Sequence, residues 1–521
     1  MKRLLLMLAV AGALWSAACS GNGIVNPPPP VGKYSKASLN GQYAFVTNGE
    51  SFTGGLSATP LARTGSFTAD GLGNITTGVE DVNAPGMVSP ALQITGGSYT
   101  VNADGRGTLT LQLGQNSIDF GIVLTSTSDG LMIDETSNSS QSSTGSGNFI
   151  KQSAGSFQVS GITGPYVFDF AGLDGSGNPE SFVGEFTANN GAASAGFFDD
   201  NDNGTFSSGS FVGTIAQDAT LSSFGRGIAL IAGQNYVFYI VDSTRVRFIS
   251  TNGGMLSGDA VAQSNTVPTN VSSVNSSFVL IVAGSSINGG ITRVGRFTAN
   301  GATVTNVLED TNDGGHFIKT DSGTNASIAL DAANPGRGTL TFTDPNFLNA
   351  PGKYVFYLSS ATQGVIQEQT VNNSGAVDVA DGTIAAQTGS PFSSSNISGT
   401  YALNWSGLSL QNSGSFNVQD EEDLLSQVNV TSLSLKGAAD IFQFQNGVPV
   451  FDLVTSGSIS IAGDGTSSTG ASSRNTMSVK LTKSNSTTVN FVVYFVNPQL
   501  AFFTNNQDMN RIVAGVLKTQ Q

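Results

Sequence analysis

The sequence predicts an all-β protein made of four tandem copies of one antiparallel β-meander. Apolar and aromatic residues alternate with Thr, Ser, Asn and Gln through most of the chain, and clusters of Gly, Asn, Asp and Ser interrupt this alternation at short intervals. The alternation is typical of half-buried strands, and the clusters are typical of tight turns. Similar phrases also return along the 521 residues, which indicates internal repeats.

Each copy opens with a strand that combines a small residue with aromatic ones. The four openings are "GQYAFV" at 41–46, "GPYVFDF" at 164–170, "SSFVLIV" at 276–282 and "GTYALNW" at 399–405. A second phrase ends in a Gly-containing turn, as "GSFTADG" at 65–71, "GEFTANNG" at 184–191, "GRFTANG" at 295–301 and, faintly, "IFQFQNG" at 441–447. Glycine supplies the positive φ angles that such turns need.

A third phrase has arginine as its second residue and is followed by one bulky strand. It reads "GRGTLTL" at 105–111, "GRGIALI" at 225–231, "GRGTLTF" at 336–342 and "SRNTMSVKL" at 473–481. The copies close near Gln152, Gln263, Gln387 and Gln520. We therefore expect β repeats at 37–152, 153–263, 264–388 and 389–521, each with its own core.

The first copy contains about eight alternating runs, starting near residues 41, 61, 73, 94, 107, 117, 130 and 146. An even number of short antiparallel strands can close with the first strand beside the last, which leaves no exposed edge. The sequence therefore predicts an eight-stranded up-and-down barrel in each repeat. A β-sandwich fits the same meander, and a propeller with two blades per repeat fits the length.

The first eighteen residues have the plan of a cleavable export signal. Lys2 and Arg3 precede an apolar stretch too short for a membrane span, and small residues precede Cys19. The ending "SAAC" at 16–19 resembles the lipobox of bacterial lipoproteins, which implies cleavage before Cys19 and lipid attachment to it. Cys19 is the only cysteine, so no internal disulfide competes for it. Ser20 follows the cysteine and, by analogy with enteric lipoproteins, implies that the protein is located at the outer membrane. Residues 19–36 are expected to form a Gly- and Pro-rich tether.

Composition argues against nucleic acid as a partner. Charged residues are 11% of the chain, and 21 basic side chains face 36 acidic ones. Without Lys2 and Arg3 the balance is 19 against 36, a net charge of −17. Such a field repels nucleic acid and anionic membranes, so we expect the protein to be held at the membrane by its lipid.

Residues that would carry catalysis are scarce. His316 is the single histidine and lies in a Gly-rich segment of one copy only, which favours an exposed loop residue over a triad or metal site. The acidic run "DEED" at 420–423 is expected to be a solvated loop or short helix start rather than a glycosidase pair. We therefore expect no enzyme activity and no required cofactor.

One acidic motif recurs after the third strand, as "EDVN" at 80–83, "DDNDNG" at 199–204 and "EDTNDGG" at 309–315. In the second copy Asp199, Asn201 and Asn203 match the opening of a calcium loop, although the later glutamate is replaced by Ser210. Plain turn chemistry is the favoured interpretation. A weak calcium site is the alternative.

The predicted outline is similar to the lipocalin and avidin architectures, whose barrel mouths hold one small ligand. Biotin is not expected, because Trp405 is the only tryptophan in the mature chain. We expect a non-catalytic, surface-anchored lipoprotein with a structural, binding or adhesive role. The alternative is a protein that binds a glycan or another small molecule through barrel mouths or loop ends; a protein ligand is a further option.

Overall fold

The structure is a computed structural model. It describes residues 32–52, 58–85, 87–137, 142–153, 157–322, 326–343, 351–371, 377–413, 416–443, 449–461, 474–482 and 486–521. Strands dominate these residues, and the helical elements among them are single 3₁₀ turns: η1 (Lys36–Ser38), η2 (Val159–Gly161), η3 (Ser222–Phe224) and η4 (Val271–Ser273).

Barrel 1 consists of nine strands that occupy eight positions around the barrel. They are β1 (Asn40–Phe52), β2 (Ala58–Asp70), β3 (Asn74–Ala84), β4 (Met87–Ile94), β5 (Gly96–Tyr99), β6 (Arg106–Leu113), β7 (Asn116–Leu124), β8 (Asp129–Asp134) and β9 (Ser142–Lys151). Strands β4 and β5 both pair with β3, one after the other, and so share one position. The barrel closes because β1 pairs with both β2 and β9.

Barrels 2 and 3 repeat this plan. Barrel 2 contains β10 (Gly164–Leu173), β11 (Pro179–Asn189), β12 (Ala192–Asp202), β13 (Thr205–Gln217), β14 (Arg226–Ile231), β15 (Gln234–Asp242), β16 (Arg245–Ser250) and β17 (Met255–Ala262). Barrel 3 contains β18 (Asn275–Ser286), β19 (Gly289–Asn300), β20 (Thr303–Asp313), β21 (His316–Ser322), β22 (Ala326–Leu330), β23 (Arg337–Thr343), β24 (Pro351–Leu358), β25 (Gln363–Glu368) and β26 (Val379–Ala386). Here β21 and β22 share one position beside β20.

Barrel 4 is the divergent copy. It contains β27 (Gly399–Ser413), β28 (Phe416–Thr431), β29 (Ser434–Gln443), β30 (Val450–Ser460), β31 (Arg474–Thr482), β32 (Ser486–Asn497), β33 (Leu500–Asn505) and β34 (Arg511–Thr519). Pairing of β27 with β34 closes it. The all-β prediction and its eight-stranded barrels are thus confirmed, in preference to the sandwich and the propeller.

Alternation along the strands fills each barrel with its own core. In barrel 1, Tyr43 and Phe45 on β1 pack inside against Phe67 on β2 and Phe149 on β9. Comparable clusters fill barrels 2, 3 and 4. Phenylalanine at these positions is therefore core, as its recurrence in the sequence indicates.

The sequence-based alignment of the fourth copy was wrong by one strand. Val428 pairs with Tyr401 as Phe67 pairs with Tyr43, so residues 426–432 take the place of "GSFTADG". Of the segment 441–447, residues 441–443 lie one strand later, in β29, and residues 444–447 lie outside the described residues. A search for Gly-containing turns missed this hairpin because its positive φ angles belong to Ser432 and Leu433.

The acidic run at 420–423 was also misinterpreted. It lies within strand β28, and Glu422 and Asp423 are fully buried. Glu422 accepts from Arg511 inside barrel 4, and Asp423 accepts from Thr144 of barrel 1 at 2.6 Å. Burial is possible because each carboxyl group meets hydrogen-bond donors, which a local sequence window does not reveal.

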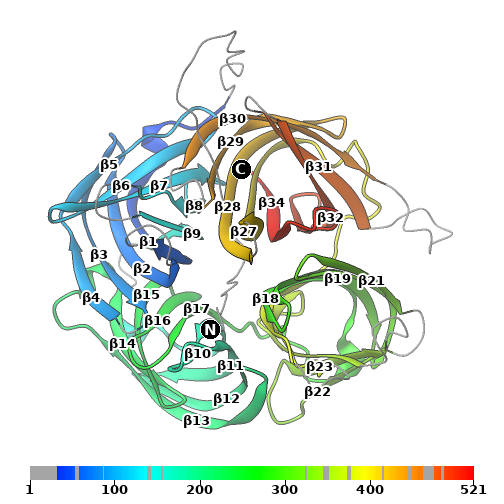
Figure 1. Ribbon diagram of the computed structural model, residues 1–521. Coiled ribbons are helices and arrows are strands. Elements are labelled where there is room, and N and C mark those ends of the chain that lie inside the picture. The colour runs from blue at the N-terminus through cyan, green and yellow to red at the C-terminus, as the bar shows by residue number, and fades with distance from the viewer. Residues whose placement is uncertain are drawn as a thin grey trace.

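The four barrels form a closed ring. Figure 1 shows them around a common centre in chain order, with barrel 4 beside barrel 1. Barrel 4 reaches barrel 1 through the backbone N–H of Gln521, which donates to the carbonyl of Thr125 at 2.7 Å, and through the ion pair of Lys518 with Asp129. Among the described residues, no helix has the length and apolar character that a membrane crossing needs.

Candidate functional site

The recurring acidic residues lie at the joints between barrels. Asp199 on β12 of barrel 2 accepts hydrogen bonds from Arg337 of barrel 3 through both carboxylate oxygens, each at 2.7 Å. The hydroxyl of Tyr357, also in barrel 3, donates to Asp199 at 2.6 Å. A bidentate, largely buried pair of this kind fixes one barrel on the next.

The same joint occurs in barrels 1 and 3. Asp81 binds Arg226 and Tyr239 of barrel 2, and Asp310 binds Arg474 and Tyr494 of barrel 4. The joint that closes the ring has a looser form of the same pair. Asp440 of barrel 4 has the register position of the three aspartates above, but Arg106 of barrel 1 contacts it at 3.4 Å and also contacts Asp452 at 2.7 Å. Val123 stands where the other joints have tyrosine.

A second contact accompanies each Asp–Arg pair. Asn201 donates through its side-chain amide to the carbonyls of Glu368 and Asp378 of barrel 3, and Asn83 and Asn312 donate across their own joints. The glutamines that close the repeats also donate hydrogen bonds to the next barrel. Gln152, for example, donates through its side-chain amide to the carbonyl of Ile240 of barrel 2.

These contacts bear on the calcium hypothesis. Asp199 and Asn201 are engaged at the joint, while Asn203 has a φ of 48° and forms the turn after β12. A calcium ion at this turn would have to displace Arg337 from Asp199. Within the described ranges, no three His, Cys, Asp or Glu side chains come together as a metal site. Calcium binding here stays a prediction.

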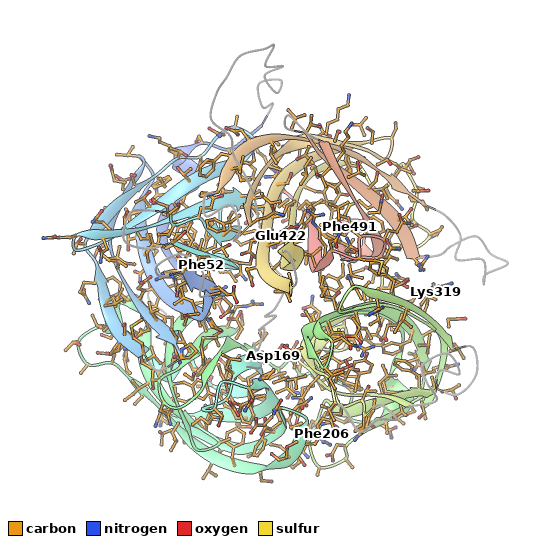
Figure 2. The ribbon with its side chains drawn as sticks, viewed as in Figure 1. Phe52, Asp169, Phe206, Lys319, Glu422 and Phe491 are labelled. Atoms are coloured by element: carbon orange, nitrogen blue, oxygen red, sulfur yellow. The ribbon has the colours of Figure 1, made fainter. Side chains whose placement is uncertain are left out.

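The candidate binding site is a cavity of about 380 Å³ at the inner side of the ring, where barrels 1, 2 and 3 meet. We call it the axial cavity. Its walls come from the inward-facing sides of neighbouring barrels, and Figure 2 shows Asp169 on this side. The polar lining residues are Asn48, Ser146, Asn148, Asp169, Arg245, Ser257, Asp259, Ser359, Gln363, Asp381 and Thr383.

Two carboxyl groups from different barrels meet in this wall. Asp169 is on β10 of barrel 2 and Asp381 is on β26 of barrel 3, where it is only 4% exposed. Burial raises the pKa of both, and the negative charge of Asp381 raises the pKa of Asp169 further. Two adjacent carboxyl groups of this kind share a proton. Asp169 Oδ1 and Asp381 Oδ2 have no hydrogen-bond partner within the described structure.

Donors line the same cavity. Arg245 forms an ion pair with Asp259 at 2.8 Å, and Ser257 donates to Asn48 Oδ1 at 2.6 Å. Arg247, behind them, is fully buried and donates to the carbonyl of Asn148 at 3.1 Å. Burial lowers the pKa of Arg247 to about 10. The cavity wall thus contains both donors and acceptors.

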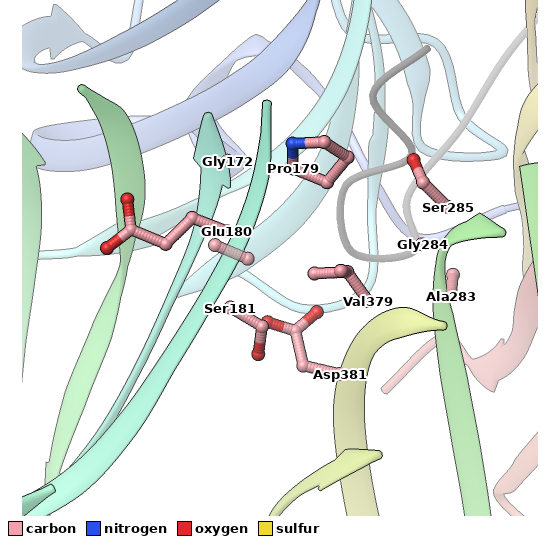
Figure 3. Close-up of a pocket in the computed structure, with 10 residues that line it drawn as sticks. Gly172, Pro179, Glu180, Ser181, Ala283, Gly284, Ser285, Val379 and Asp381 are labelled. Atoms are coloured by element: carbon pink, nitrogen blue, oxygen red, sulfur yellow. The ribbon is translucent and has the colours of Figure 1, made fainter. Parts of the chain in front are cut away.

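A smaller space of about 10 Å³ adjoins the axial cavity, with Asp381 in both walls. Figure 3 shows Asp381 beside Ser181 of β11. Glu180, the preceding residue of β11, points away from Asp381. A space of this size accommodates about one water molecule.

The other sequence candidates lie away from this cavity. His316 is exposed, as expected from the sequence, but it is the first residue of strand β21 and not a loop residue. Cys19 lies outside the described residues. The axial cavity itself was missed, because its residues come from three repeats and form no motif in the sequence. A signal did exist: charged residues are rare in this chain, yet Asp169, Asp259 and Asp381 fall in otherwise apolar strands.

Comparisons with known proteins identify no family. No family model matches the chain, and no curated protein matches it. Similar solved structures include a putative AttH from Nitrosomonas europaea (9% identity, 66% of this chain and 92% of that one, TM-score 0.16). Transferrin binding protein B from Neisseria meningitidis (10% identity, 74% and 82%, TM-score 0.20) and a mutant of that protein from Haemophilus parasuis (9% identity, 97% and 98%, TM-score 0.18) are also similar. At these TM-scores the similarities support no conclusion.

Proposed function

We propose that this chain is a non-catalytic, lipid-anchored protein of the bacterial surface that binds a polar ligand in the axial cavity. The observation that carries this proposal is the cavity itself. Its volume of about 380 Å³ lies in the range of small-molecule sites, and side chains of three barrels converge on it. The carboxyl groups of Asp169 and Asp381, which come from two different barrels, line this space.

The lining favours a polyhydroxylated ligand, such as a short glycan or a sugar-like small molecule. Hydroxyl groups both donate and accept, so they suit a wall in which the carboxyl oxygens of Asp169 and Asp381 accept and Arg245 donates. The described interiors of the barrels are filled by their own cores. This favours the space between barrels over the barrel mouths.

A lipid on Cys19 would hold the ring at the outer membrane. The proposal rests on the sequence "SAAC" and on the absence of any other cysteine. Replacing Cys19 by serine should leave the export signal uncleaved and without an attached lipid, and should change the membrane fractionation of the protein. Unchanged processing and fractionation in the Cys19→Ser variant would rule out this anchor.

The ligand is tested with the mature protein in detergent on a glycan array, followed by calorimetry with the strongest hits. Asp381→Asn should weaken binding about tenfold or more, because it removes a charged acceptor from the wall. Asp200→Asn is the matched control, since Asp200 is a largely buried carboxylate on β12 of barrel 2 that does not line the axial cavity. Absence of any glycan or polar small-molecule binding, or equal binding by both variants, contradicts the proposal.

A further inference from the structure

A second cavity, of about 420 Å³, lies at the joint where barrel 4 meets barrel 1. We call it the closing cavity. Barrel 1 contributes Thr108, Thr110, Asp119, Glu135 and Ser137 to its wall, and Pro449 and Phe451 come from barrel 4. It therefore exists only in the closed ring.

Glu135 is the unusual residue in this wall. It is only 4% exposed, yet its Oε1 atom has no hydrogen-bond partner within the described structure. Asp119, the second carboxylate in the wall, accepts from Thr110 at 2.7 Å. A buried carboxylate without a partner is costly, and the cost is relieved by a proton or by a bound cation.

The other three joints are built differently at the corresponding positions. Gly121 pairs with Ile133 in barrel 1, and the matching residues of the other barrels are Val237, Val355 and Val492. Each of these valines packs in an apolar cluster between barrels. Barrel 1 alone has glycine there, and a Cβ atom at Gly121 would lie 2.7 Å from Glu135 Oε1.

The acidic residues are also specific to this joint. The backbone N–H of Glu135 donates to the carbonyl of Asp119, and the matching bonds join Thr251 to Asn235, Gln369 to Lys353 and Asn506 to Asn490. Both residues are acidic only in barrel 1. The glycine that makes room and the two acids that line the space occur together, at one joint of four.

We propose that the closing cavity binds an organic cation, namely a primary ammonium group on a short alkyl chain. The ammonium group would bind Glu135 and Asp119, and the alkyl chain would lie against Pro449 and Phe451. Phe451 is an aromatic side chain that is 44% exposed, and an ammonium ion is further stabilised near an aromatic ring. This site is separate from the axial cavity and does not depend on the function proposed for it.

Ionisation of Glu135 supplies a distinctive readout. Burial raises its pKa well above the ordinary value, as do the nearby charges of Asp440, Asp134 and Asp119, and the charge of Arg106 opposes this. A bound cation stabilises the ionised form, so binding near neutral pH should release a proton. The heat of binding should therefore differ between phosphate and Tris buffers.

The test is calorimetry of the mature protein with butylammonium chloride, with acetyl-lysine methylamide and with the neutral analogue 1-butanol. Butylammonium should bind and 1-butanol should not. Binding of the lysine derivative as well would identify protein side chains as a source of the cation, and its failure would restrict the site to free amines. Both results support the site. Failure of both cations, or equal binding of 1-butanol, overturns it.

The variants use residues that the protein itself has at other joints. Gly121→Val with Glu135→Thr introduces the pair found in barrel 2, Val237 and Thr251, and should abolish binding and proton release. Glu135→Gln should weaken binding about tenfold or more. Asp200→Asn is the control and should bind as the unmodified protein does. Butylammonium affinity that is unchanged in Glu135→Gln or in the double variant overturns the proposal, provided that thermal melting shows both to be folded.

Discussion

Arg226 of barrel 2 binds both carboxylate oxygens of Asp81 of barrel 1, with Nε to Oδ2 at 2.9 Å and Nη2 to Oδ1 at 2.8 Å. The two residues are 145 positions apart in the chain, and both are largely buried. Equivalent pairs join barrels 2 and 3 and barrels 3 and 4. The repeated unit therefore includes its own connection to the next copy, with aspartate on one side of each barrel and arginine on the other.

Loss of one partner of such a pair should be strongly destabilising. Arg337→Ala leaves Asp199 buried with only Tyr357 as a side-chain donor, so the free energy of unfolding should fall by about 3–5 kcal/mol in a guanidinium titration. The partly exposed pair of Lys518 with Asp129 is the control. Lys518→Ala should change the free energy of unfolding by less than about 1 kcal/mol. Equal effects of the two substitutions would contradict the role given to the joint.

The tyrosine at each regular joint should contribute less than the arginine. Tyr357→Phe removes one hydrogen bond to a buried carboxylate and keeps the ring, so a loss of about 1.5–3 kcal/mol is expected. Thermal or chemical unfolding measures it. If Tyr357→Phe is as stable as the unmodified protein, the hydroxyl makes no net contribution and the bidentate pair alone holds the joint.

Ring closure should depend on pH through Asp423. Burial raises the pKa of Asp423 from 3.8 to about 7, while hydrogen bonds from Ser146 and Thr144 lower it. Because the folded protein keeps this proton to higher pH than the unfolded chain does, the free energy of unfolding should fall as the pH rises from about 4 to about 7. The stabilisation from protonated Asp423 is fully present below the pKa of this group in the unfolded chain, and it is lost above its pKa in the folded protein.

The variant Asp423→Asn cannot ionise, so its stability should change less between pH 5 and pH 8 than that of the unmodified protein. Asp129→Asn, at a partly exposed position of the same joint, should leave the difference as it is. Burial also raises the pKa of Glu180 to about 8, so part of the pH dependence should remain in Asp423→Asn. A pH profile of Asp423→Asn that matches the unmodified protein would refute this assignment.

A single barrel should fold alone. Residues 153–263 contain all eight strands of barrel 2 and its aromatic core around Phe168, so we expect cooperative melting of this fragment. It should melt at a lower temperature than the full ring, since Asp199 and Arg226 lose their partners. A disordered fragment would show that the barrels depend on each other to fold.

The sequence was sufficient for the barrels because strand alternation and Gly-containing turns are local features. It was insufficient where a role depends on distant copies. Asp199 was interpreted as a turn or calcium residue because its partner Arg337 lies 138 positions away. The arginine nevertheless recurs at a fixed place in all four copies and the aspartate in three similar acidic phrases, and in a chain with few charges this pattern was an available signal.

Both cavities were beyond sequence reasoning for the same reason. Asp169 and Asp381 come together only because barrel 3 is docked on barrel 2. Glu135 gains its significance only when Gly121 is compared with Val237, Val355 and Val492 at the same register position. The sequence matches "SIDFGIVLTS" at 117–126 with the bulky strands of the other copies, but only the strand pairing shows which residue of one copy corresponds to which residue of another.

Closure of the ring is the central claim, since the closing cavity exists only if barrel 4 meets barrel 1. It is tested most directly by zero-length carbodiimide cross-linking of the mature protein followed by peptide mass spectrometry. Lys518 Nζ lies 2.9 Å from Asp129 Oδ1, so an amide bond between these two side chains is predicted, within one chain and independent of protein concentration. Detection of both peptides without any link between them, under conditions that modify other carboxylates, would contradict a closed ring.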